Sequence, residues 1–298
     1  MPIDLAIVPV AGQGTRMLPL TKSQPKEMLP VGGKPAVQYV VEELAESGIR
    51  RLLFITGPGK DSIENHFDID SELIALLRET GKEELLAELE FERRNLEYFY
   101  TRQRRQLGLG HAVLCARSFV GEQPFVVALG DSIIGVNAQS DIVARMVEEF
   151  EKSGADAVVA IETVPIHEVQ QYGVAKPRTS DGPVFLIEDL IEKPSPEEAP
   201  SNLTLAARYV LGPAIFECLS RTQPDRGGQV QLTDALRLLI QGGGRVLGMR
   251  LAEGETRHDI GDFENYFRSF VEFALADGKY GAGLRNYLIQ LLQRTPGN

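Results

Sequence analysis

The chain has 298 residues, of which 43% are hydrophobic and 24% charged, and its formal net charge at pH 7 is −11. This composition is typical of a globular protein with one large or two modest domains, and the acidic balance argues against a general nucleic-acid or anionic-membrane binder. No apolar run approaches the roughly 18 residues that a membrane-spanning helix needs. The first residues enter a strand pattern without the basic segment of a signal peptide. We therefore expect a cytoplasmic protein that binds neither nucleic acid nor membrane.

Short apolar runs alternate with amphipathic stretches along the chain, which indicates an α/β fold. In chain order, strands are predicted at residues 3–10, 51–56, 96–101, 124–129, 156–161, 184–191, 204–211 and 245–251. Helices are predicted at residues 35–47, 71–90, 109–117, 139–153, 213–220, 231–241, 262–277 and 284–293. The first half reads β-α-β-α-β, so we expect a Rossmann-like mixed, mostly parallel central sheet flanked by helices. In the second half the strands follow one another more closely, which predicts antiparallel strands added to the same sheet.

The last 40 residues are predicted to be helical and amphipathic. Apolar side chains at helical spacing share one face in each of two segments: Phe263, Phe267, Phe270, Val271 and Ala274 in the first, and Leu284, Tyr287, Leu288 and Leu291 in the second. We expect both faces to pack on the core, with a subunit interface as the alternative.

Two cysteines, Cys115 and Cys218, and four scattered histidines are present. Neither a Cys-x-x-Cys nor a His-x-x-x-His spacing occurs, so neither a zinc site nor a disulfide framework is expected. Because both cysteines stand in apolar surroundings, we predict that they are packing residues.

The loop after the first strand, "AGQGTRMLPLTKSQPKEMLP" at residues 11–30, combines glycine with basic residues. It lacks the third glycine of a dinucleotide fingerprint, and it does not match a Walker A loop. Gly12 and Gly14 let backbone N–H groups approach a ligand, and such amides at the end of a parallel strand form an anion site. Arg16 and Lys26 add positive charge to the same loop. Either cation alone would be an ordinary surface charge, but together they predict a phosphate site.

Further motifs follow in order along the chain: "SIENHFD" (62–68), "RQ" followed by "GLGHAVLCA" (102–116), "YGV" (172–174), "IEKP" (191–194), "APSNL" followed by "RYVL" (199–211) and "QLTDAL" (231–236). Together with the glycine loop, they resemble the sugar-phosphate nucleotidyltransferase family, and most closely its bacterial UTP–glucose-1-phosphate uridylyltransferases. The resemblance implies transfer of the uridylyl group of UTP to glucose 1-phosphate by in-line displacement at the α-phosphorus, with Mg²⁺ as cofactor and pyrophosphate as the leaving group. No general base is needed, because a phosphate monoester with a second pKa near ~6 is already a dianion.

The resemblance also implies which residues hold the nucleotide. Ala11, Gly12, Gly14 and Thr15 would cradle it, with Arg16 on the leaving pyrophosphate and Lys26 on the triphosphate. Glu27 would contact the base edge and Gly108 would let the backbone approach the same ring. Gln103 would bind uracil, because a side-chain amide offers both a donor and an acceptor.

At the sugar end, the resemblance places Glu192 on the glucose hydroxyls, Lys193 on the sugar phosphate and Gly173 close to the sugar. Since neighbouring side chains alternate along a strand, Glu192 and Lys193 can both reach the substrate only at a strand end or a bulge. Asp131 ends the apolar run "FVVALGD", a position suited to Mg²⁺. Asp259 in "RHDIGD" is the expected second metal ligand, with a turn or cap residue as the alternative.

We expect residues 1–298 to form one domain with three parts. These are a nucleotide-binding half at about 1–135, a sugar-binding half at about 136–255 and a C-terminal helical segment at about 256–298. A homo-oligomer, either a dimer or a tetramer, is expected.

Three alternatives stay open. The first is the same chemistry with another pair of substrates, such as dTTP or a different sugar 1-phosphate. The second is a glycosyltransferase that uses Asp68 and Asp70 in "FDID" as an Asp-x-Asp metal motif, although that pair stands between two helices. The third is a non-catalytic protein that binds sugar nucleotides.

Overall fold

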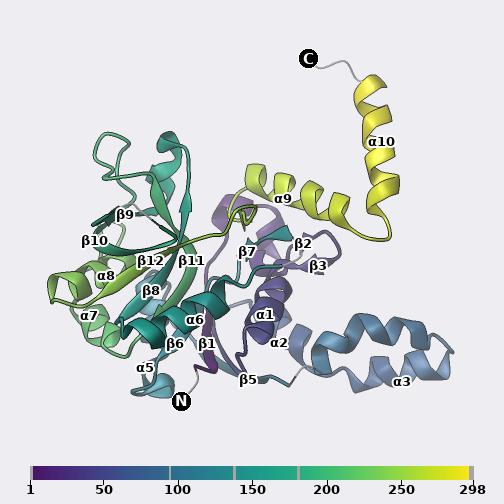
Figure 1. The fold of residues 1–298 in the computed structure, drawn as a ribbon. Coiled ribbons are helices and arrows are strands. Elements are labelled where there is room, and N and C mark those ends of the chain that lie inside the picture. The colour runs from purple at the N-terminus through teal and green to yellow at the C-terminus, as the bar shows by residue number, and fades with distance from the viewer. Residues whose placement is uncertain (1–2, 94, 137–138, 180–181, 295–298) are drawn as a thin grey trace.

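A nine-stranded mixed sheet forms the centre of the protein (Figure 1). The computed structural model describes residues 3–93, 95–136, 139–179 and 182–294. The outer ends of the predicted domain, residues 1–2 and 295–298, lie outside this range. The predicted fold class is confirmed, and the sheet takes strands from both predicted halves of the domain.

The strand order of this sheet is β5-β4-β1-β6-β11-β8-β12-β10-β9, and two small two-stranded sheets, β13-β7 and β2-β3, accompany it. The strands are β1 (Leu5–Pro9), β2 (Pro30–Val31), β3 (Lys34–Pro35), β4 (Arg51–Thr56), β5 (Glu97–Arg102), β6 (Phe125–Ala128), β7 (Ser132–Ile134), β8 (Ala157–Thr163), β9 (Gly173–Pro177), β10 (Val184–Glu192), β11 (Leu203–Leu211), β12 (Val246–Arg250) and β13 (Arg257–Asp259). All eight predicted strands are found.

Ten α-helices are formed by the described residues: α1 (Ala36–Glu46), α2 (Asp61–Phe67), α3 (Ser71–Glu79), α4 (Leu109–Leu114), α5 (Arg117–Val120), α6 (Ile142–Ser153), α7 (Ile215–Arg221), α8 (Leu232–Gln241), α9 (Phe263–Ala276) and α10 (Gly281–Arg294). The described residues also form 3₁₀ helices: η1 (Thr15–Met17), η2 (Leu20–Lys22), η3 (Lys26–Met28), η4 (Glu83–Arg93) and η6 (Ile166–Gln171). Among the helices described, none is long and apolar enough to cross a bilayer.

The parallel part of the sheet contains a reversal of strand order. β1 pairs in parallel with β4 on one side and with β6 on the other, and β4 pairs in parallel with β5. The chain therefore leaves β1 in one direction and later returns to its opposite edge. In open α/β sheets, ligands bind at such a switch point, outside the carboxyl ends of the strands. The glycine loop follows β1 and Asp131 follows β6, so both stand at this point.

The antiparallel strands predicted for the second half are also present. β11 pairs antiparallel with β6 and β8, and β10 pairs antiparallel with β12 and β9. The register of β11 against β8 shifts between Leu205 and Tyr209, and Ala207 within this irregularity has φ of 60°. Arg208 follows Ala207 in this irregularity, and its Nη2 donates to the carbonyl oxygen of Ser132, the first residue of β7, at 2.9 Å.

Helices cover both faces of the sheet, as strand alternation requires. Leu5 and Ile7 of β1 belong to a core cluster with side chains of α4, α7 and α8, whereas Ala6 and Val8 belong to a second cluster with side chains of α1, α2 and α6. Cys115 and Cys218 are free and pack against the first cluster, which agrees with their predicted role.

Two predicted helices are shorter than expected. The helix predicted for residues 71–90 ends at Glu79, because Gly81 adopts φ of 70° and Lys82 N donates to Leu77 O in a Schellman-type cap. The following segment forms η4 instead. The helix predicted for 109–117 is divided into α4 and α5.

The prediction that the C-terminal helices pack their apolar faces on the core is wrong for most of those side chains. Phe273 of α9 is buried, but Phe267 is 58% exposed, and Phe270, Val271, Tyr287 and Leu291 are exposed as well. Figure 1 shows that α10 leads away from the sheet beyond α9. Helical periodicity reports that a face is apolar, but it does not report whether the partner belongs to the same chain.

Candidate active site

Every residue that the family resemblance places in the site borders one of two adjoining cavities. The nucleotide cavity, of about 490 Å³, is bordered by Ala11, Gly12, Gly14, Thr15, Lys26, Glu27, Gln103, Gly108 and Asp131. The sugar cavity is bordered by Arg16, Asp131, Gly173, Glu192, Lys193 and Asp259. The two share Leu109, Leu129 and Asp131, so they adjoin at Asp131.

The glycine loop is shaped by the left-handed backbone of Gly14, whose φ is 66°. Thr21 Oγ1 donates to the carbonyl oxygen of Gly14 at 2.7 Å, and a Cβ atom added to Gly14 would lie 3.0 Å from Thr21 Cγ2. A side chain is therefore excluded by both conformation and space. The loop folds back so that Lys26, in η3, borders the same cavity as Gly12 and Gly14.

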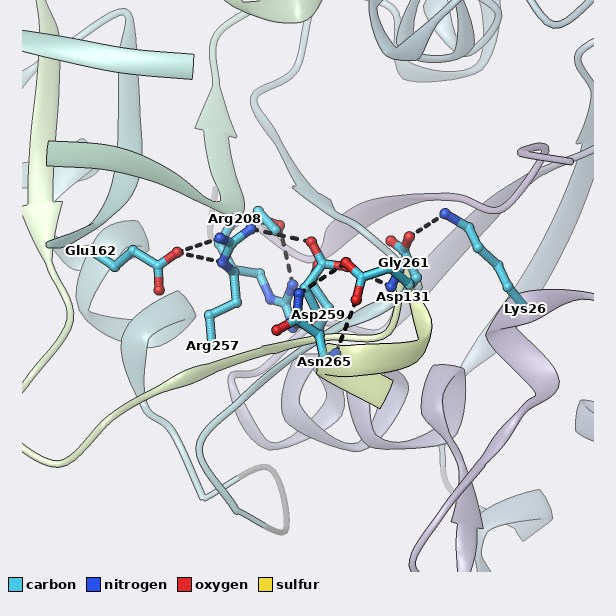
Figure 2. Close-up of polar contacts among 11 residues, drawn as sticks. Lys26, Asp131, Glu162, Arg208, Arg257, Asp259, Gly261 and Asn265 are labelled. Carbon is cyan, nitrogen blue, oxygen red and sulfur yellow. Dashed lines mark hydrogen bonds and ion pairs between the residues drawn. The ribbon is translucent and has the colours of Figure 1, made fainter. Parts of the chain in front are cut away.

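Lys26 and Asp131 form an ion pair at the junction of the two cavities (Figure 2). Burial by itself lowers the pKa of Lys26, but the carboxylates of Asp131 and Glu27 outweigh this effect and raise it. Burial raises the pKa of Asp131, and Lys26 more than offsets that effect, so the pKa stays below its ordinary value. Both groups are therefore charged at neutral pH, and they form a neutral pair whose ammonium group borders the nucleotide cavity.

Asp259 reaches the same place from the other end of the chain. β13 pairs antiparallel with β7, so that Asp259 lies opposite Ser132, and Ile260 N donates to Asp131 O at 3.1 Å. Burial and the nearby Asp131 raise the pKa of Asp259. Its Oδ1 accepts from Gly261 N at 2.8 Å, as expected for a turn residue, while Asp262 caps α9. The structure thus brings the two carboxylates predicted to bind metal to one cavity.

Glu27 lies differently from what its predicted contact with the base suggests. Its side chain is almost fully buried, and Oε2 accepts from Lys60 Nζ at 2.7 Å. Burial raises the pKa of Glu27, and Lys60 and Lys26 oppose that rise. Within the described chain only Oε1 is left for a base, so the predicted contact stays a prediction. Lys60 was not identified from the sequence.

Gln103 stands directly after β5, and its side chain is buried beside the nucleotide cavity. Its Nε2 donates to the carbonyl oxygen of Gly108 at 3.0 Å and lies 3.0 Å from Nδ1 of His111. The amino group is therefore already engaged by the protein, whereas the sequence suggested that both ends of the amide would serve the base. Gly108 is required by backbone packing, since a Cβ atom there would lie 2.6 Å from Val230 O.

At the sugar end, β10 ends at Glu192, and the next residue, Lys193, has φ of 46°. The predicted interruption of the strand is confirmed, and it places both side chains on the sugar cavity. Lys193 N donates to Tyr172 O at 2.9 Å, and its Nζ lies 3.6 Å from Glu192 Oε1. A non-glycine residue in this conformation is strained, and such strain is concentrated at functional sites.

Arg257 is a residue of the sugar cavity that was not identified from the sequence. Its Nε and Nη2 donate to Oε1 of Glu162 at 2.6 and 2.5 Å, and Nη1 lies 3.5 Å from Oδ2 of Asp259 (Figure 2). Its Cζ also lies 4.2 Å from the centroid of the Tyr172 ring. Arg257 and Asp259 are two residues apart, so strand alternation places their side chains on one face. This spacing could have identified Arg257 as a site residue from the sequence.

We expect Arg257→Lys to lower kcat/KM about tenfold and the free energy of unfolding by about 1–2 kcal/mol, because a lysine cannot donate to Glu162 and lie against Asp259 at once. Arg237→Lys is the matched control. Its guanidinium also donates twice to a carboxylate, Asp189, but it lies outside both cavities. Steady-state kinetics and urea denaturation check the pair. Equal loss of kcat/KM in both variants would contradict a role of Arg257 in the site.

Comparison with known proteins decides the family. The model of the family described as nucleotidyl transferase matches residues 5–274. The chain belongs to this family. UTP–glucose-1-phosphate uridylyltransferase YngB of Bacillus subtilis is 44% identical to this nucleotidyltransferase over 97% of the chain and 95% of the relative.

Solved structures agree with this assignment. A structure described as UTP-bound UGPase from Acinetobacter baumannii superposes on the nucleotidyltransferase with a TM-score of 0.88 and 38% identity, covering 97% of this chain and 99% of the other. A UDP-glucose pyrophosphorylase in complex with UDP-glucose superposes with a TM-score of 0.82 and 35% identity, covering 92% and 100%. The resemblance inferred from the sequence motifs is confirmed.

Proposed function

We propose that this nucleotidyltransferase transfers the uridylyl group of UTP to glucose 1-phosphate, releasing pyrophosphate and forming UDP-glucose. The observation that carries the proposal is the meeting of two cavities at Asp131. One presents the glycine loop and Gln103 to a nucleotide, and the other presents Glu192 and Lys193 to a sugar phosphate. The names of the similar proteins, UTP–glucose-1-phosphate uridylyltransferase and UDP-glucose pyrophosphorylase, support the choice of substrates.

The proposed mechanism depends on charge, because nucleophile and electrophile are both anions. Lys193 holds the sugar phosphate at the strand end. An oxygen of that phosphate attacks the α-phosphorus of UTP in line with the bond to pyrophosphate, which breaks as pyrophosphate leaves. Arg16 and Lys26 stabilise the charge that develops on the leaving group. The attacking phosphate is already a dianion at neutral pH, so positioning and electrostatic stabilisation are sufficient without a general base.

We propose Mg²⁺ as the cofactor, held by Asp131 and Asp259. The described residues contain no cluster of three or more acidic, histidine or cysteine side chains that could hold an ion alone. A pair of carboxylates nevertheless fits Mg²⁺, which is bound through one or two carboxylates together with substrate phosphates. When bound, the ion would neutralise charge on the phosphate oxygens. Lys26 lowers the pKa of Asp131 and so favours its ionised carboxylate, the form that would bind the ion.

The glycosyltransferase alternative is not favoured by the geometry. Asp68 directly follows α2 and Asp70 caps α3, where its Oδ1 accepts from Leu73 N at 2.9 Å. Neither residue borders the nucleotide or the sugar cavity. A silent binding protein would be expected to have lost one of the cations or carboxylates of the site, and all of them are present.

The proposed reaction is tested by a matrix of nucleoside triphosphates against sugar 1-phosphates, with Mg²⁺ present and pyrophosphate release as the readout. The expected result is the highest kcat/KM for UTP with glucose 1-phosphate. Absence of turnover with that pair would overturn the proposal. Preference for dTTP or for another sugar 1-phosphate would favour the same chemistry on different substrates.

We also propose that the protein is a homo-oligomer, a dimer or a tetramer. The support is the set of exposed apolar side chains on α9 and α10, which includes Phe267, Phe270, Tyr287 and Leu292. Size-exclusion chromatography with light scattering should give a multiple of 32.8 kDa. The double variant with Phe267→Ser and Tyr287→Ser should have a lower mass. A parent protein with the mass of a single chain would contradict the proposal. Location in the cytoplasm stays a prediction from the sequence.

A further inference from the structure

We propose that His111 is a positioning residue for base selection. It orients the Gln103 amide so that only the carbonyl oxygen is offered to the base, and the site thereby selects bases with an N–H at the pairing edge. The inference rests on the proposed function, in which Gln103 meets the uracil of UTP. It adds a residue that touches no substrate and a specific direction of discrimination.

The orientation of the Gln103 amide follows from its partners. The carbonyl oxygen of Gly108 can only accept a hydrogen bond, so the atom 3.0 Å from it must be the amide nitrogen. The second hydrogen of that nitrogen points to Nδ1 of His111, also at 3.0 Å. Rotating the amide by half a turn would set its oxygen against the Gly108 oxygen. Gly108 and His111 therefore use both hydrogens of the amino group.

His111 can accept this bond only as the neutral tautomer with the proton on Nε2. The ring stands in the first turn of α4, and burial lowers its pKa, which favours the neutral form at physiological pH. The Sγ atom of Cys115, the C-cap residue of α4, lies 3.8 Å from the same Nδ1, and its thiol is a weak donor at most. The lone pair of Nδ1 therefore accepts the hydrogen bond from Gln103 Nε2.

The free end of the amide is Oε1. Among the described residues no donor bonds to it, and Gln103 borders the nucleotide cavity. An oxygen fixed in this way accepts from the N3–H of uracil. Cytosine has a lone pair at N3, so the same oxygen would oppose it, and a site built for one hydrogen bond rejects a base that cannot make it. We therefore expect a lower kcat/KM for CTP than for UTP.

The test compares kcat/KM for UTP and for CTP, with glucose 1-phosphate, in His111→Leu, His111→Asn and the parent enzyme. His111→Leu removes one of the two acceptors that hold the amino group, so that only the Gly108 carbonyl oxygen opposes rotation of the amide, and it should lower the UTP-to-CTP ratio about tenfold, as expected for one hydrogen bond. His111→Asn places an amide oxygen near the position of Nδ1 and should restore the ratio to within about threefold of the parent. Gln103→Ala sets the lower limit of the ratio.

His167→Ala is the control, because this histidine is exposed and borders neither cavity. A purely structural role of His111 would lower turnover of both nucleotides equally, and an unchanged ratio in His111→Leu would overturn the inference. Equal ratios in His111→Asn and His111→Leu would overturn it as well. Calorimetric titration with UTP and CTP gives the corresponding ratio of dissociation constants without turnover. Should the parent enzyme fail to make UDP-glucose, the proposed function fails, while the binding ratio still tests His111.

Discussion

Lys193→Ala is expected to lower kcat by about 10²- to 10³-fold, the range for loss of one group that stabilises a charged transition state. The side chain stands at the end of β10 with φ of 46°, and 53% of it is exposed. The backbone N–H bond to Tyr172 O is retained in the variant, and no buried contact is lost. We therefore expect the midpoint of thermal unfolding to stay within about 2 °C of the parent value, since surface changes are small in energy.

The matched control for this variant is Lys176→Ala. Lys176 is a half-exposed lysine of β9 that pairs with Glu188 at 2.9 Å and borders neither cavity. Steady-state pyrophosphate release and thermal denaturation of both variants separate the site from general surface charge. Near-normal kcat in Lys193→Ala would remove this lysine from the chemistry.

Glu43→Ala is expected to lower the free energy of unfolding by about 3–5 kcal/mol, because it leaves a buried guanidinium unpaired. Arg208 and Glu43 are both fully buried, and Arg208 donates through Nε and Nη2 to the two carboxylate oxygens at 3.1 and 2.6 Å. The same guanidinium donates from Nη1 to the carbonyl oxygen of Ala207 at 3.1 Å and from Nη2 to that of Ser132 at 2.9 Å. Loss of Glu43 would therefore loosen the connection between β6 and β7 that contains Asp131.

Urea denaturation measures this prediction, and Glu264→Ala provides the comparison. Glu264 pairs with Arg268 on the exposed surface of α9, with both side chains largely exposed, so its removal should change stability by about 1 kcal/mol or less. A small effect of Glu43→Ala, similar to that of Glu264→Ala, would mean that water or a rearranged side chain compensates Arg208.

The strands and the location of the site could be predicted from the sequence because both depend on local pattern. Apolar runs such as Phe125–Ala128 identify buried strands without knowledge of their partners. The carboxyl ends of parallel strands meet at one edge of a sheet, so the loops after β1 and β6 had to lie together. The strand interruption between Glu192 and Lys193 was predictable for a similar reason, since uninterrupted alternation would have separated the two side chains.

Only the tertiary structure decided which charges pair and which faces are covered. Arg257 and Glu162 are 95 residues apart, and Lys60 and Glu27 are 33 apart. No periodicity connects such residues, because their contact depends on how the strands are ordered. The short pairing of β7 with β13, which brings Asp259 beside Asp131, has too few residues to leave a pattern.

The sequence by itself determined that the glycine loop and its two cations form an anion site, because glycine and the basic residues lie close together in the chain. The amide of Gln103, engaged by Gly108 and His111, and the exposed face of α9 and α10 were decided by the fold. Hydrogen-bond partners and apolar partners are distributed in space, and a linear pattern specifies that a group needs a partner without specifying which one.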